Sequence, residues 1–198
     1  LVESLANPIT GALADDDTQL SKFHGIYQQD DRDVRSERTR QKLEPAYSFM
    51  IRARVPGGIC TPAQWLNMDD VAVRHANGTI RLTTRQAFQL HGVVKTQLKQ
   101  TIQEINRRMT DTLAACGDVN RNVMACPAPT GDPARLQMQR LADEIAEHLA
   151  PRSPAYHEIW LNGEQVEQGE VEEPIYGKLY LPRKFKVGFA LPDDNCVD

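Results

Sequence analysis

Between residues 47 and 125, the apolar side chains switch repeatedly between a period of two and a period of three to four. A period of two is typical of a half-buried strand, and the longer period is typical of an amphipathic helix. The segments that we expect are strands at 47–55, 79–83, 87–91 and 118–125 and helices at 61–76 and 96–115. The order β-α-β-β-α-β predicts an α+β unit of the ferredoxin-like kind.

The segments on either side of this unit are less regular. Residues 1–45 are polar, show no strand or helix period at 23–33, and predict an arm with one short helix at 34–43. After a proline-rich loop, we expect a helix at 134–149 and strands at 157–161 and 184–191. We divide the chain into an N-terminal arm (1–45), a ferredoxin-like half-domain (46–126) and the truncated start of a second, incomplete α+β domain (127–198).

Composition and charge restrict the class of protein. The chain is 40% hydrophobic and 25% charged with a formal net charge of −4, which is ordinary for a globular protein. A general nucleic-acid binder would carry a basic excess, so we expect no nucleic-acid partner. No apolar run approaches the roughly 20 residues that span a bilayer. Residues 1–17 hold several acids and no base, unlike a signal peptide, so we expect a cytoplasmic protein with no membrane contact.

The cysteines do not follow a metal-binding pattern. The chain has four, Cys60, Cys116, Cys126 and Cys196, and no two of them form a C-x-x-C pair. Structural zinc sites and iron–sulfur clusters usually draw on close cysteine pairs. We therefore expect free thiols and no metal site built from this chain alone.

Basic and amide side chains recur at alternate positions of the expected strands. Such a spacing places each set on one side of a sheet. The sets are Arg52 with Arg54, Arg81 with Thr83 and Arg85, Gln89 with His91, and Lys184 with Lys186. One arginine on a strand usually faces solvent, but four segments with the same pattern predict a binding site for carboxylates or a small oxyanion.

Five segments together carry a family resemblance. They are F-H-G-I-Y-Q-Q-D-D-R-D at 23–33, R-A-R-V-P-G-G at 52–58, R-L-T-T-R-Q-A-F-Q-L-H at 81–91, N-R-N-V at 120–123 and Y-L-P-R-K-F-K at 180–186. In this order they resemble the hemoprotein of assimilatory, NADPH-dependent sulfite reductases, within the siroheme nitrite/sulfite reductase family. The resemblance implies a second domain of the siroheme-binding type after the half-domain. The first and last segments favour sulfite over nitrite as substrate.

The resemblance also implies roles for particular residues. Those that would contact the bound anion are Arg52, Arg121, Lys184 and Lys186. Those that would contact siroheme are Arg81, Thr83, Arg85, Gln89, His91 and Arg54. The family also holds a 4Fe-4S cluster on two close cysteine pairs, which we expect beyond Asp198 because no such pair occurs in this chain.

The function implied is the six-electron reduction of sulfite to sulfide in sulfate assimilation and cysteine biosynthesis. A flavoprotein alpha subunit would donate the electrons, and this chain by itself would be inactive. Two alternatives stay open. One is a ferredoxin-dependent siroheme nitrite reductase, and the other is a non-catalytic, ferredoxin-like anion-binding module that needs no tetrapyrrole.

Overall fold

A computed structural model describes residues 1–152, 160–161, 164–165, 173–177, 180–193 and 197. The helices and strands are α1 (Val2–Ala6), α2 (Asp15–Phe23), β1 (Ile26–Asp30), α3 (Arg32–Arg40), β2 (Tyr47–Ala53), α4 (Pro62–His75), β3 (Ile80–Leu82), β4 (Phe88–Val93), α5 (Leu98–Asn106), α6 (Pro133–His148), β5 (Trp160–Leu161) and β6 (Glu164–Gln165). Two short 3-10 turns, Pro56–Gly58 and Lys95–Gln97, follow β2 and β4.

The central feature is a four-stranded antiparallel sheet in the order β1-β2-β4-β3. Helix α4 lies between β2 and β3 in the chain and α5 follows β4, and this arrangement confirms the predicted α+β, ferredoxin-like fold. One strand differs from the prediction. The edge beside β2 is occupied by β1, from the segment expected to be an irregular arm, and not by residues 118–125.

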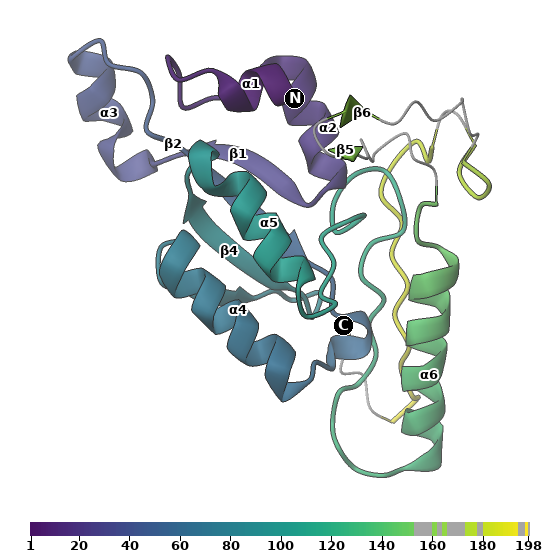
Figure 1. Cartoon of the computed structure of the whole chain (residues 1–198). Coiled ribbons are helices and arrows are strands. Elements are labelled where there is room, and N and C mark those ends of the chain that lie inside the picture. The colour runs from purple at the N-terminus through teal and green to yellow at the C-terminus, as the bar shows by residue number, and fades with distance from the viewer. Residues whose placement is uncertain (153–159, 162–163, 166–172, 178–179, 194–196, 198) are drawn as a thin grey trace.

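Helices α4 and α5 cover one face of this sheet (Figure 1). The core lies between them and includes Phe49, Ile51 and Leu90 of the sheet with Met68 of α4 and Ile105 of α5, all at most 1% exposed. Burying a side chain of this size stabilises the fold by about 1.5–3 kcal/mol. Because side chains alternate along a strand, the residues between these apolar positions lie on the opposite face, which α4 and α5 leave uncovered.

Helix α4 begins as the sequence predicts. The Thr61 hydroxyl accepts a hydrogen bond from the Gln64 backbone, and the Gln64 side chain accepts one from the Thr61 N–H. Pro62 occupies the first helical position, where its missing N–H costs nothing. This capping box fixes the residue at which α4 begins.

Helix α5 ends earlier than predicted. Its apolar period suggested a helix through residue 115, but the helix stops at Asn106. Met109 adopts a left-handed conformation (φ 58°) and is 91% exposed. The chain that follows forms hydrogen bonds with distant segments in place of helical ones. The Arg54 N–H donates to the Asp111 carbonyl at 2.7 Å, and the Ala114 N–H donates to the Phe23 carbonyl at 2.7 Å.

A second apolar cluster lies beside the sheet domain. Helix α6 contributes Met138, Ala142 and Ala146, which pack with Val123 and Ala125. The predicted strands at 118–125 and 184–191 are reduced to two parallel bridges, Asn120 with Phe185 and Met124 with Gly188. The predicted strand at 157–161 lies outside the described residues except for its last two positions, which form β5. In the part of the chain that the structure describes, no helix has the length and apolar character to cross a membrane.

Candidate functional site

Three polar side chains stand in register across the open face of the sheet. Gln89 of β4 lies opposite Arg52 of β2 on one side and opposite Arg81 of β3 on the other. Side chains of directly opposed residues lie on the same face of a sheet. The Arg52 Nη2 donates a hydrogen bond to the Gln89 Oε1 at 2.9 Å, so the carboxamide holds the guanidinium in place.

The row continues along β4 to His91. Because the Gln89 oxygen accepts from Arg52, its Nε2 donates to the His91 Nε2 at 2.6 Å. The proton of a neutral imidazole then lies on Nδ1, which donates to the Gln29 Oε1 of β1 at 3.2 Å. Burial, with the nearby guanidiniums of Arg81 and Arg52, lowers the pKa of His91, which agrees with a neutral ring.

Arg85 is presented by the turn between β3 and β4. The Thr83 hydroxyl accepts hydrogen bonds from the backbone N–H groups of Arg85 (3.3 Å) and Ala87 (3.2 Å) and so shapes this turn. Burial, with the guanidiniums of Arg121 and Arg52, lowers the pKa of Arg85. The structure therefore gathers three arginines from three separate segments.

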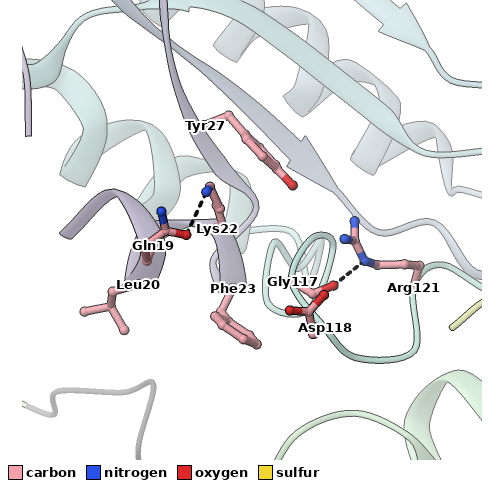
Figure 2. Close-up of a pocket in the computed structure, with 8 residues that line it drawn as sticks. All are labelled: Gln19, Leu20, Lys22, Phe23, Tyr27, Gly117, Asp118 and Arg121. Carbon is pink, nitrogen blue, oxygen red and sulfur yellow. Dashed lines mark hydrogen bonds between the residues drawn. The ribbon is translucent and has the colours of Figure 1, made fainter. Parts of the chain in front are cut away.

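Arg121 follows the irregular loop after α5 and is only 6% exposed. Its Nε donates to the Gly117 carbonyl at 2.7 Å, and its Nη1 donates to the Ala115 carbonyl at 3.3 Å. Figure 2 shows the guanidinium directed back toward Tyr27 of β1. Backbone carbonyls thus orient this cation, and no carboxylate of the described residues forms an ion pair with it.

The segment with Lys184 and Lys186 lies directly beside Arg121. The Arg121 N–H donates to the Phe185 carbonyl at 3.0 Å, and the Phe185 N–H donates to the Val119 carbonyl at 3.1 Å. Both lysines are exposed. The charge of Arg183 lowers the pKa of Lys184, and slight desolvation and the charges of Arg121, Lys186 and Arg85 lower it further.

These residues form one basic cluster, defined as Arg52, Arg81, Arg85, Arg121, Lys184 and Lys186. Among the described residues, none of the six makes an ion pair with a carboxylate. Like charges that are gathered in this way repel one another unless an anion neutralises them. The basic cluster is therefore suited to a ligand that carries several negative charges.

Arg54 is placed apart from the basic cluster. Its Nη2 donates to the Ala146 carbonyl of α6 at 2.8 Å, and only 9% of the residue is exposed. Burial lowers the pKa of Arg54. The structure thus places the Arg54 guanidinium between β2 and α6, and its predicted contact with siroheme stays a prediction.

The sequence reasoning missed three residues of the same region. Tyr27 and Gln29 lie on the open face of the sheet. They were missed because the strand β1 was not predicted. Cys116 is fully buried, and its Sγ lies 3.5 Å from the Arg52 Nη1. Burial, and the Cys116 thiol beside it, raise the pKa of Tyr27. The alternation of Ile26-Tyr27-Gln28-Gln29 was too short a signal to identify the strand.

A pocket with a volume of about 430 Å³ opens beside Arg121 (Figure 2). Its walls come from α2, β1 and the loop before Arg121 and include Phe23, Tyr27 and Gly117. Lys22 and Asp118 lie at the same pocket with opposite charges. The pocket therefore lies between α2 and Arg121.

The described cysteines Cys60, Cys116 and Cys126 form no disulfide, and Cys196 lies outside the described residues. Within those residues, no group of three or more His, Cys, Asp or Glu side chains could hold a metal ion. The donors that the site offers are cationic and amide N–H groups, which suit carboxylates and oxyanions.

Comparison with known proteins places the chain among similar sequences. A family described as the nitrite/sulfite reductase ferredoxin-like half domain matches residues 40–108. A sulfite reductase [NADPH] hemoprotein beta-component of Staphylococcus saprophyticus is 60% identical over 200 residues, which cover all of this chain and 35% of that protein. A protein of the same name from Myxococcus xanthus is 61% identical over 198 residues, again all of this chain and 35% of the relative.

A solved structure of the NirA protein of Mycobacterium tuberculosis shares the fold, with a TM-score of 0.63 and 20% identity over 94% of this chain and 32% of that one. The chain spans about a third of the length of the curated relatives it matches. The resemblance carried by the five sequence segments is confirmed. The chain belongs to the nitrite/sulfite reductase family.

Proposed function

We propose that this chain supplies the anion-binding and siroheme-contacting side chains of an enzyme that reduces sulfite to sulfide with six electrons. One observation carries the proposal: the basic cluster gathers cations from separate segments without a carboxylate partner among the described residues. The names of the relatives, sulfite reductase hemoprotein beta-components, support sulfite as the substrate.

The donors present fit a carboxylate-rich tetrapyrrole. Arg81 and Arg52 flank Gln89 in one row, and Arg85 lies within electrostatic reach of Arg52. A planar guanidinium can bind a carboxylate through two parallel hydrogen bonds, so this row can hold several acidic side chains of one ring. When bound, siroheme and an iron–sulfur cluster supply the electron chemistry. The proposal assigns no cluster ligand to the described residues, because they hold no such group of side chains.

The anion-binding residues divide into two kinds. Arg52 and Arg121 carry guanidinium groups, which stay protonated in proteins, so they are suited to clamp an oxyanion and stabilise negative charge as electrons arrive. Lys184 and Lys186 hold protons on Nζ that can pass to the substrate as its oxygens leave as water. The lowered pKa of Lys184 makes that transfer easier, because its cationic neighbours disfavour the protonated form.

The wider setting is part of the same proposal. We place the enzyme in the cytoplasm, in sulfate assimilation and cysteine biosynthesis. Its electrons come from a flavoprotein alpha subunit that oxidises NADPH. The names of the relatives include NADPH and describe a beta-component, which supports a second component as electron donor.

The test uses the protein encoded by the complete reading frame, produced with an adequate supply of siroheme. We expect tetrapyrrole absorption in the visible spectrum and turnover of sulfite in preference to nitrite with a reduced viologen dye. Arg121→Ala should abolish most sulfite turnover while the absorption band persists, and Arg108→Ala, on an exposed site after α5, serves as the matched control.

Three outcomes would contradict the proposal. Preferential nitrite turnover with ferredoxin would make the protein a nitrite reductase. A folded protein without tetrapyrrole absorption would favour the anion-binding module. Equal turnover by Arg121→Ala and Arg108→Ala would remove Arg121 from the site.

A further inference from the structure

We infer that Asn122 is the positioning residue that holds Arg85 and Arg121 at a fixed separation, an inference that rests on the proposed function of the basic cluster. Asn122 is only 2% exposed and lies next to Arg121 in the chain. Its Oδ1 accepts a hydrogen bond from the Val55 N–H at 2.9 Å, and its Nδ2 donates to the Val55 carbonyl at 2.8 Å. The carboxamide therefore binds the chain three residues beyond Arg52 through both backbone groups.

The same Nδ2 also reaches the turn that presents Arg85. It lies 2.9 Å from the Arg85 carbonyl and 3.2 Å from the Gln86 carbonyl. An amide nitrogen has two hydrogens, so these contacts and the one to Val55 include a shared hydrogen bond. One side chain thus joins the three segments that carry Arg52, Arg85 and Arg121.

The side chain of Gln86 makes a second contact between this turn and the segment after Asn122. The Gln86 Nε2 donates to the Ala125 carbonyl at 2.7 Å, and the Ala125 N–H donates to the Gln86 Oε1 at 3.1 Å. Gln86 adopts a left-handed conformation with φ 54°, which a non-glycine residue adopts only when its surroundings hold it there. The turn is therefore attached to the segment 122–125 through two adjacent residues, Arg85 and Gln86.

The attachment of the turn keeps Arg85 in place against the repulsion of its cationic neighbours. The guanidiniums of Arg85, Arg121 and Arg52 repel one another, and a flexible turn would let Arg85 move away into solvent. Backbone hydrogen bonds from a neutral, buried carboxamide resist that movement without neutralising the charge. A displacement of about 1 Å in a catalytic group can cost about a hundredfold in rate.

The experiment compares Asn122→Ala with Asn67→Ala in the siroheme-loaded, full-length protein. Asn67 is a matched control, because its Nδ2 also donates to a backbone carbonyl, that of Glu104 at 2.8 Å, but on the helical side of the sheet. We expect Asn122→Ala to raise the sulfite KM about tenfold and to lower siroheme retention. Asn67→Ala should change the thermal unfolding midpoint alone.

A double-mutant cycle separates positioning from a general loss of stability. If Asn122 acts through Arg85, Asn122→Ala should lower siroheme retention much less in an Arg85→Ala background than in the wild type. Additive effects, or a KM and siroheme content equal to those of Asn67→Ala, would overturn the inference while leaving the proposed function intact. A wild-type protein that binds no siroheme would instead overturn the proposed function and this inference with it.

A second variant covers the case in which Asn122→Ala does not fold. Gln86→Asn tolerates the left-handed conformation but is too short to reach Ala125. It should raise the sulfite KM and lower siroheme retention in the same direction as Asn122→Ala. Wild-type values of both quantities in Gln86→Asn would overturn the inference.

Discussion

The Arg52 guanidinium donates to the Gln89 carboxamide oxygen at 2.9 Å, while Arg81 lies opposite Gln89 on the other side. A neutral side chain thus separates two cations in one row and orients one of them. Gln89→Leu removes the acceptor at nearly constant volume. We expect the sulfite KM of the full-length enzyme to rise about tenfold, because Arg52 loses its fixed orientation. Steady-state kinetics would measure this, with Gln137→Leu, on an exposed position of α6, as the control. An unchanged KM would mean that Arg52 needs no support from Gln89.

Lys186 is an exposed member of the basic cluster. If it delivers protons to the substrate, Lys186→Ala should reduce kcat for sulfite about a hundredfold while the siroheme band keeps its intensity. Stopped-flow turnover and the visible spectrum measure the two quantities on one sample. Lys99→Ala removes an exposed lysine from α5 and should leave both unchanged. A normal kcat in Lys186→Ala would exclude Lys186 from proton delivery.

Arg85 is partly buried near Arg121 and Arg52, which makes it a strong partner for a carboxylate. Arg85→Ala should weaken cofactor retention, seen as less siroheme per protein chain after gel filtration. Arg107→Ala serves as the control, since Arg107 is exposed and paired with Glu104 at 3.0 Å. Equal siroheme content in the two variants would show that Arg85 does not hold the cofactor.

Arg54 links β2 to α6 through the Ala146 carbonyl. Arg54→Ala should lower the free energy of unfolding by about 1–3 kcal/mol, because a buried carbonyl loses its donor and a cavity replaces the side chain. Denaturant unfolding followed by circular dichroism measures this change. We expect the siroheme content of the folded variant to match the wild type, and a selective loss of siroheme without loss of stability would return Arg54 to the cofactor site.

His91 should make stability depend on pH. Its pKa in the folded protein lies below the ordinary value, so between the two values the unfolded chain binds more protons than the folded one. The free energy of unfolding should therefore fall as the pH drops through about 6.5. His91→Gln should show a weaker dependence between pH 7.5 and 5.5 in urea unfolding, with His148→Gln, on the exposed end of α6, as the control. Parallel curves for wild type and His91→Gln would contradict the neutral assignment.

Local sequence patterns correctly predicted those elements whose buried side chains follow their own apolar period or whose ends carry a capping signal. Strand β2 alternates buried Phe49, Ile51 and Ala53 with Arg52, and α4 begins at its Thr-Pro signal. The exceptions, β1 and the end of α5, were set by contacts with segments distant in the sequence. Strand β1 has few apolar residues and forms because β2 offers it a free edge, and α5 stops early because the following chain pairs with Arg54 and Phe23.

By itself, the sequence determined the α+β class, most of the sheet and helices, the family, and which cations alternate along each segment. Only the tertiary structure decided which of those cations meet. Arg52 and Arg54 are two residues apart, yet one joins the row at Gln89 and the other reaches α6. The reason is that a period of two describes one strand, whereas the meeting of side chains from β2, the Arg85 turn and the Arg121 loop depends on long-range hydrogen bonds such as those of Asn122.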